Sequence, residues 1–583
     1  MSNSNLGLNR KISSVVSKNL TDTESDIYKQ ISEIASEYTI EEDPTREYII
    51  TKIETGEGDL GLITILESDS IKKATQDTFK YYTNLKKVKL PSCTEVGSRA
   101  FASCTQLTSI DLPNVSFIDN EAFGYYYTFW QEDDKYWPSG KAFSYCTKLE
   151  NINIPNIKTI GSYAFRNCSS LKTIDLSNAE SIGDHAFIEC SSLESIILSA
   201  NINRLPEGIF HNCTSLSNID LSNITSIGDY SFYCCQLSGT IDLSNVTSIG
   251  KSAFEGCKGI ISIILSENRT DLPDRIFAGC NSLTSINLSN IRTIGSYALA
   301  STNLSNIDLS NIIELKSGAF ANCNITTDIL ETLNPNITVL DTGVFCNTNI
   351  TSINLPNIIT IKDGSSYHNG TFSGCQKLIL INLPNVTDLG DYCFYKCEAL
   401  TSISTENIPK VTKIKGYTFA ECTNLTSVDL PNVTNFEENV FYKCTNLTSV
   451  NLPNLIDAYQ YTFAYCTSLT SISLPKLTST YQDFFGCTSL KSINLPSATK
   501  IGYQTFPNCT SLIALILSSN ELVILNSYDV FYNTPIANGT GYVYVPDSLV
   551  DSYKSDNKWS TYASQIKPIS ELPQEYKTLY NIT

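Results

Sequence analysis

The sequence has few of the residues on which catalysis and nucleic-acid binding usually depend. It contains three histidines, His185, His211 and His368, and none of them stands near a recognisable nucleophile. It has no P-loop and no dinucleotide-binding fingerprint, so we expect no enzyme activity and no cofactor. Basic residues are also scarce, with 40 Lys and Arg against 59 Asp and Glu and a net charge of −19. This acidic excess repels phosphate backbones and excludes nucleic acid as an expected partner.

Long apolar runs are missing as well. No stretch of about 18 consecutive apolar residues occurs, so we expect no transmembrane helix and no membrane insertion. The first residues also lack an apolar segment of signal-peptide length and a small-residue cleavage site. We therefore expect that the chain is not secreted through a signal peptide.

The sequence instead consists mostly of one repeated unit of about 22 residues. LTSVDLPNVTNFEENVFYKCTN, residues 425–446, is followed directly by LTSVNLPNLIDAYQYTFAYCTS, residues 447–468. A fixed period of this length predicts a solenoid, in which each coil buries its apolar face against its neighbours. The fold class predicted is an α/β leucine-rich-repeat solenoid, rich in β-structure, with one short strand per coil and about nineteen coils over residues 79–523.

Each unit has an inward and an outward side. In the segment L-x-x-I-x-L the Ile and the last Leu are predicted to point inward, and the residue between them outward. A Pro-Asn or Ser-Asn pair then turns the chain, and a later A-F-x-x-C segment supplies the opposite wall of the core.

Cysteine occurs twenty times, mostly at one position of the repeat. A small thiol packs well inside a coil, so this column is interpreted as core and metal binding is not expected. Neighbouring coils also bring the α-carbons into the range for disulfides, and the redox state stays open. The cysteines assigned to the column are Cys104, Cys146, Cys168, Cys190, Cys213, Cys235, Cys257, Cys280, Cys323, Cys346, Cys375, Cys397, Cys422, Cys444, Cys466, Cys487 and Cys509.

The two ends differ from the repeat. Residues 1–78 are predicted to hold a helix from Thr21 to Tyr38 and short strands near Ile49 and at Gly61–Leu66. The apolar face of that helix either caps the first coil or attaches the chain to a partner or to a second copy. Residues 524–583 are predicted to cap the other end through a strand at Tyr542–Val545 and a following helical segment that carries Leu549, Val550, Tyr553 and Trp559.

Interruptions of the period are the first candidates for binding. One insertion covers residues 124–140 and a second covers residues 362–370, while residues 302 and 325–340 depart from the pattern. Aromatic loops supply contact surfaces for glycans or proteins, or they fold back over exposed core. The candidate residues are Tyr125, Tyr126, Tyr127, Phe129, Trp130, Tyr136 and Trp137 on the first insertion and Tyr367 and His368 on the second.

A polar column on the outward side of the strands is the second candidate. Strand faces of solenoids often bind ligands, but such a column also keeps an exposed sheet soluble. It comprises Asp111, Asn153, Asp175, Asp220, Asp242, Asn287 and Asp308, and continues with Asn354, Asn382, Asp429 and Asn451.

The units IGSYAF-x-x-C at residues 160–168 and LTSINLSNIRTIGSYAL at residues 283–299 resemble the BspA-like leucine-rich repeat proteins. The resemblance covers about residues 79–570 and implies adhesion without shared catalytic residues. Similar proteins are adhesins on bacterial or protist surfaces, or tail and fibre proteins of bacteriophages. Because no leader, anchor or membrane span is found, we expect a virion protein that attaches to a host surface glycan or protein receptor. Other virion proteins, or a second copy, would contact its N-terminal segment. A bacterial cell-surface adhesin and an intracellular scaffold are the alternatives.

Overall fold

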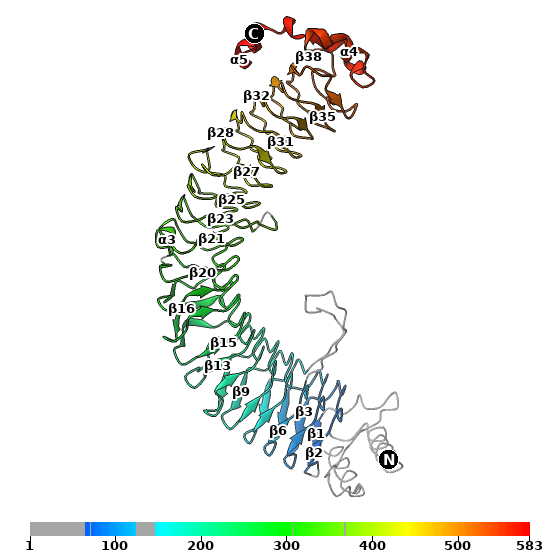
Figure 1. The fold of residues 1–583 in the computed structure, drawn as a ribbon. Helices are drawn as coiled ribbons and strands as arrows, with labels where there is room; N and C mark the ends of the chain where they lie inside the picture. Colours follow the sequence, from blue (N-terminus) through cyan, green and yellow to red (C-terminus); the bar gives the residue numbers. More distant parts are fainter. Residues whose placement is uncertain (1–64, 70, 124–145, 306, 367–368, 583) are drawn as a thin grey trace, which may run out of the picture. The chain divides into compact units, whose positions relative to one another are not determined.

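The computed structural model describes residues 65–69, 71–123, 146–305, 307–366 and 369–582. It divides into two compact units, one reaching Arg269 and including Pro273–Asn287, and the other formed by Thr270–Leu272 and the residues from Leu288 onward. In both units most coils carry two short strands, and equivalent strands of successive coils pair in parallel within several small sheets (Figure 1). The predicted solenoid is confirmed, with a second strand per coil in addition to the one expected.

The first strand of a coil comes from the L-x-x-I-x-L segment. In the first unit these strands are β1 (Ile65–Glu67), β3 (Lys87–Lys89), β5 (Ser109–Asp111), β7 (Asn151–Asn153), β9 (Thr173–Leu176), β11 (Ser195–Leu198), β14 (Ser238–Leu243), β16 (Gly259–Leu265) and β18 (Ser285–Ile286). In the second unit they are β22 (Ser352–Asn354), β24 (Leu380–Asn382), β26 (Ser402–Ser404), β28 (Ser427–Asp429), β30 (Ser449–Asn451), β32 (Ser471–Ser473), β34 (Ser492–Asn494), β36 (Ala514–Ile516), β38 (Tyr542–Val545) and β39 (Ile566–Pro568).

The second strand of a coil is a two-residue segment that follows the Asn turn. The first unit contains β2 (Lys73–Ala74), β4 (Glu95–Val96), β6 (Phe117–Ile118), β8 (Thr159–Ile160), β10 (Ser181–Ile182), β12 (Arg204–Leu205), β13 (Ser226–Ile227) and β15 (Ser248–Ile249). The second unit contains β17 (Asp271–Leu272), β19 (Thr293–Ile294), β20 (Glu314–Leu315), β21 (Val339–Leu340), β23 (Thr360–Ile361), β25 (Asp388–Leu389), β27 (Lys413–Ile414), β29 (Asn435–Phe436), β31 (Asp457–Ala458), β33 (Ser479–Thr480), β35 (Lys500–Ile501) and β37 (Ile524–Leu525).

The alternation predicted for the first strand is present. In β9, Ile174 and Leu176 are buried while Thr173 and Asp175 are exposed. Because β9 pairs in register with β11, each inward residue meets the equivalent residue of the next coil. The leucines and isoleucines of the repeat therefore form continuous columns in the core.

Phenylalanine forms the column on the opposite wall. The rings of neighbouring coils stack face to face, as between Phe123 and Phe165, whose centroids are 5.0 Å apart, and between Phe441 and Phe463, at 5.7 Å. Offset stacking adds to the free energy that burial of these rings provides. One large ring per coil thus sets the packing of that wall.

The cysteine column lies beside the phenylalanines and is buried, as predicted. Its thiols also donate hydrogen bonds to the phenylalanine carbonyl of the preceding coil. The Sγ to oxygen distance is 3.1 Å from Cys104 to Phe79 and 3.0 Å from Cys257 to Phe232. Cysteine therefore satisfies a buried backbone acceptor as well as filling space, which explains why the position is rarely a plain hydrophobe.

One cysteine assignment was wrong. Cys346 directly follows Phe345, and the column position three residues after that ring is Thr348. The Thr348 hydroxyl donates to the Phe345 carbonyl at 2.8 Å and contacts Cys375 Sγ at 3.3 Å. Thr302 makes the equivalent bond to Leu299 at 2.8 Å, so threonine replaces the thiol with another small donor.

Asparagine in the turn after the first strand links neighbouring coils. Its amide donates to the carbonyl of the preceding coil's turn, at 2.7 Å from Asn114 to Pro91 and 2.8 Å from Asn454 to Pro431. The frequent Asn of the repeat is thereby explained by backbone satisfaction.

The strand pairing extends beyond both ends of the range 79–523 predicted for the repeats. At the start, β1 pairs with β3 and β2 pairs with β4, so a coil is already present at Ile65. The strand expected at Gly61–Leu66 is found at Ile65–Glu67 within the described residues. The helix predicted at Thr21–Tyr38 and the strand near Ile49 lie outside them.

At the other end β37 pairs with β35, and β38 and β39 extend the first-strand sheet. The predicted strand Tyr542–Val545 is confirmed as β38. Helical turns follow as η2 (Asp547–Leu549), α4 (Val550–Ser555), η3 (Trp559–Gln565), η4 (Ile569–Glu571) and α5 (Gln574–Tyr580).

These turns close the core. The indole of Trp559 is fully buried, packs on Phe531 at the end of the ring column and donates to the Val523 carbonyl at 2.7 Å. Tyr544 and Tyr576 join a separate buried cluster over the outward side of β36 and β38. The capping role predicted for Tyr553 and Trp559 agrees with these contacts, while Leu549 and Val550 are half-buried.

The irregular segment predicted at residues 325–340 has no first strand. It forms the short helix α3 (Asp328–Glu331), which buries Ile329 and Leu330. Thr332 then accepts the Leu309 amide at 3.0 Å, so a side chain satisfies a backbone group that a strand would otherwise pair. None of the helices in the described part of the chain is long and apolar enough to span a membrane.

The thiols should differ sharply in reactivity. All twenty are free, and only Cys234 is not buried. Burial raises the pKa of Cys375 to about 11 and that of Cys422 to about 12, which keeps these groups protonated and unreactive near neutral pH. We expect a thiol reagent such as 5,5′-dithiobis(2-nitrobenzoate) to modify about one cysteine per native chain and all of them in denaturant. Cys234→Ser should remove the native reaction, and rapid native labelling of several thiols would contradict the buried column.

Candidate functional site

The polar column predicted on the strand face is outward-facing and in register. Asp111 pairs with Asn153, and Asp429 pairs with Asn451 on the adjacent strand. All predicted members are exposed except Asp111 and Asn382, which are half-buried. The column is interrupted by Ile197 and Ile264, which occupy the same outward position and expose 58% and 46% of their surface.

The hydrogen bonds made by each side chain of the column depend on the residue that stands two positions later in the sequence. Where it is serine, the aspartate accepts the serine amide, at 2.9 Å for Asp175, Asp220 and Asp242 and 2.8 Å for Asp308. This bond from the Ser222 amide lowers the pKa of Asp220.

Where the later residue is proline, no amide hydrogen exists and the side chain bonds to the next coil instead. Asn153 donates to Asp111, and Asn451 to Asp429, each at 2.7 Å. Much of the column's hydrogen-bonding capacity is thus used inside the solenoid. Its ligand-binding role stays a prediction.

The described histidines are packing residues. His185 stacks on Tyr163 with ring centroids 4.9 Å apart, and His211 stacks on Tyr233 at 4.6 Å. Burial lowers the pKa of His211 to about 4, which makes it a poor proton acceptor near neutral pH. Within the described ranges no group of three or more His, Cys, Asp or Glu side chains is arranged to hold a metal ion.

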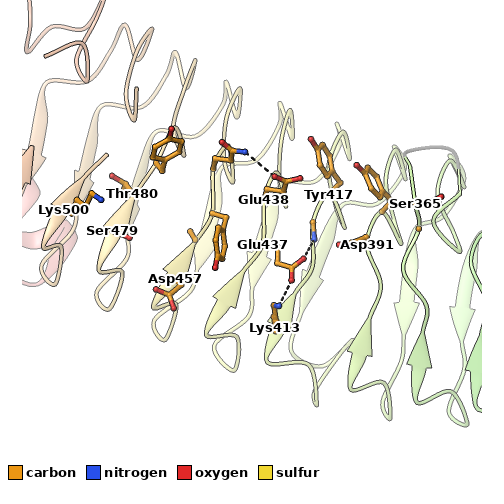
Figure 2. A pocket seen from close by; sticks show the side chains of 17 residues that line it. Ser365, Asp391, Lys413, Tyr417, Glu437, Glu438, Asp457, Ser479, Thr480 and Lys500 are labelled. Carbon is orange, nitrogen blue, oxygen red and sulfur yellow. Dashed lines mark hydrogen bonds and ion pairs between the residues drawn. The ribbon is translucent and has the colours of Figure 1, made fainter. Parts of the chain in front are cut away.

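A groove of about 900 Å³ lies over the second strands of the second unit. Figure 2 shows its side chains on successive coils, from Ser365 and Asp391 at one end to Ser479, Thr480 and Lys500 at the other. Tyr392, Tyr417, Tyr459 and Tyr481 also line it. Part of the second predicted insertion, Gly364 and Ser365, belongs to its wall, while Tyr367, His368 and the whole aromatic insertion at residues 124–140 lie outside the described residues.

The position directly after the second strand holds glycine in some coils and a larger residue in others, and four successive coils along the groove carry larger residues there. Gly390 and Gly502 stand on either side of the run, and a Cβ at either position would come within 2.2 Å of a backbone oxygen of the preceding coil. Between them the position holds Lys415, Glu437, Tyr459 and Tyr481. A side chain at Gly390 or Gly502 would meet the preceding coil, whereas the side chains of Glu437, Tyr459 and Tyr481 line the groove.

The second-strand sheet is also interrupted inside the groove, since β31 and β33 belong to different sheets. In regular coils the amide after the second strand donates to the preceding coil, as from Gly502 to Thr480 at 2.8 Å. The Tyr481 amide instead donates to the carboxyl of Asp483 at 2.7 Å. Asp483, a residue that is only 1% exposed, thus replaces a lost backbone partner through Oδ2, while its Oδ1 has no hydrogen-bond partner among the described residues.

The charges in the groove are mostly acidic. Glu437 pairs with Lys413 and also accepts the Gly416 amide at 3.3 Å. Lys415, beside the groove, pairs with Asp363 and Asp388, each at 2.7 Å. Burial, followed by repulsion from Asp363 and Glu437, raises the pKa of Asp391 to about 6. Neither lysine therefore leaves the groove positively charged.

The comparisons with known proteins agree with the repeat pattern. The family model described as a BspA type leucine-rich repeat region matches residues 59–129, 139–261, 247–369, 338–460 and 434–541. The chain belongs to the BspA-type leucine-rich repeat family.

Solved structures similar to this BspA-type chain include two bacterial proteins. A leucine-rich repeat protein from Bacteroides ovatus is 24% identical, with 62% of this chain and 82% of that chain covered and a TM-score of 0.39. A leucine rich cell surface protein from Faecalibacterium prausnitzii is 21% identical, with 62% and 83% covered and a TM-score of 0.35. No curated protein matches the chain.

The groove of this BspA-type chain was not predicted from the sequence, although a signal for it is present there. Tyr459 and Tyr481 occupy the position of the recurrent glycine in Ile160-Gly161 and Ile182-Gly183. Asp483 stands immediately before a core phenylalanine, where most coils carry Ala, Val or Thr. Departures from the consensus within regular coils were therefore as informative as the insertions.

Asp483 should make the stability of its coil depend on pH. Burial raises its pKa to about 8 in the folded state, against about 4 for an unfolded aspartate. The folded chain thus holds a proton that the unfolded chain releases, and the free energy of unfolding falls as pH rises between these values. Asp483→Asn keeps an acceptor for Tyr481 and removes the titration.

The measurement is chemical denaturation at pH 5 and pH 8. The loss of stability between the two should be about 2–4 kcal/mol larger in the unaltered chain than in Asp483→Asn. Asp308→Asn is the matched control, because the pKa of Asp308 is lowered by the bond from Ser310 and the group stays ionised throughout this range. Equal pH dependence in the unaltered chain and Asp483→Asn would contradict the assignment.

Proposed function

We propose that the chain is a non-enzymatic adhesion protein whose groove, lined by residues between Gly364 and Lys500, binds a receptor on the surface of a cell. The observation that carries the proposal is the exposure of aromatic rings there. Tyr459 and Tyr481 line the groove and expose 63% and 44% of their surface. Aromatic rings held on a rigid scaffold beside polar groups are typical of recognition sites.

Membership of the BspA-type family supports the binding class of this proposal. As its carrier we propose a bacteriophage tail or fibre, with the solenoid recognising a bacterial surface receptor and the N-terminal segment attached to other virion proteins. The bacterial cell surface is the alternative carrier, and an intracellular scaffold is the third. Immunogold labelling of intact cells and of particles from an induced culture distinguishes the three.

The groove is tested by the double variant Tyr459→Ala/Tyr481→Ala. Truncation of an aromatic contact residue commonly costs about 1–3 kcal/mol, so the labelled variant should bind receptor-bearing cells at least about tenfold more weakly. The matched control is Tyr528→Ala/Tyr532→Ala, which removes two tyrosines that are 56% and 66% exposed and do not line the groove. Circular dichroism and thermal unfolding check that both variants fold.

A third variant, Trp130→Ala/Trp137→Ala, tests the aromatic insertion predicted from the sequence. If this variant loses binding while the Tyr459 and Tyr481 variant retains it, the receptor contact belongs to the insertion and the groove is excluded. Loss of binding only in the groove variant supports the proposal.

A further inference from the structure

We infer that the groove binds an extended glycan that offers hydroxyl or amino groups and carries no acidic groups. This inference rests on the proposed function, and it names the chemistry of the receptor.

The arrangement of the tyrosines suits a chain of sugars. Tyr459 and Tyr481 directly follow β31 and β33 of adjacent coils, and Tyr392 and Tyr417, each three residues after β25 and β27, form a second tyrosine pair with ring centroids 4.6 Å apart. Neighbouring parallel strands are about 4.8 Å apart, so the groove repeats its contacts along its length. A polymer of rings with apolar C–H faces meets such a surface at several coils, whereas a single small molecule meets only one.

The polar groups of the groove are mainly acceptors. Oδ1 of Asp391 is enclosed and has no hydrogen-bond partner among the described residues. Glu438 accepts a long contact of 3.4 Å from Gln460, and Asp457, on the next coil, is exposed and accepts from Asn435 at 3.0 Å. The acceptors that a hydroxyl or ammonium group of a ligand can reach are the exposed carboxylates of Glu438 and Asp457.

The same groups disfavour other polymers. Asp391, Glu437, Glu438 and Asp457 outnumber Lys413 and Lys500, and Lys413 is neutralised by Glu437. Phosphate, sulfate and uronate groups would therefore be repelled.

A peptide that added a strand would need free backbone donors at the sheet interruption. The Tyr481 amide is already bound by Asp483. The interruption in the sheet therefore offers a side-chain surface and not a backbone edge.

The experiment is a glycan array that presents neutral, amino-sugar, sialylated and sulfated oligosaccharides, followed by calorimetric titration of the strongest ligand. We expect ligands among the neutral or amino-sugar chains only. Their affinity should fall at least about tenfold in Tyr459→Ala/Tyr481→Ala and stay unchanged in Tyr528→Ala/Tyr532→Ala. Asp391→Asn keeps an acceptor and loses charge, so it should weaken amino-sugar ligands more than neutral ones. An array without ligands, or with acidic ligands only, overturns the inference.

Binding to cells that have been treated with periodate or with protease distinguishes this inference from the proposed function. Periodate, which destroys sugar diols, should abolish binding, and protease treatment should leave it. If protease alone abolishes binding that still depends on Tyr459 and Tyr481, the receptor is a protein, and the glycan inference fails while the adhesion function stands. If binding is independent of both tyrosines, the groove is excluded and both proposals fail.

Discussion

The hydrogen bonds between successive coils are the constraint on which this structure depends. A coil has two strands of two to seven residues and cannot satisfy its own amides and carbonyls, so each coil relies on the next. The same residue types recur from coil to coil because each of them supports the contact between one coil and the next. Gly390 permits close backbone approach, the Cys257 thiol and the Asn114 amide donate to carbonyls of the preceding coil, and the stacked phenylalanines hold the spacing.

The groove forms at coils where a side chain, and not the backbone of the preceding coil, satisfies a backbone amide. Large residues replace glycine at Tyr459 and Tyr481, the second-strand sheet divides between β31 and β33, and Asp483 supplies the acceptor that the preceding coil no longer provides. The first-strand sheet is divided at the same step, between β30 and β32, while the phenylalanine column continues through it from Phe463 to Phe484. A regular scaffold can thus hold an irregular surface, because the stacked core continues where the strand ladders are divided.

The polar column shows how a pattern visible in the sequence can have more than one cause. Asp220 and Asn451 occupy equivalent outward positions, yet Asp220 stabilises its own turn and Asn451 bonds to the neighbouring coil. Serine or proline two residues later decides between these uses, because only serine offers an amide hydrogen. The regularity of such a column is therefore explained by hydrogen bonds within the solenoid, and it does not by itself indicate a ligand-binding site.

The period of the sequence by itself determined the solenoid, the inward leucines and phenylalanines, the buried thiols and the capping strand at Tyr542–Val545, since each follows from local spacing and apolar burial. Only the tertiary structure revealed the start of the coils at Ile65, the contact of the Thr348 hydroxyl with the Cys375 thiol, and the groove. These features depend on which residue of one coil lies against which residue of the next. That register is set by contacts between residues about 22 positions apart, which no local pattern contains.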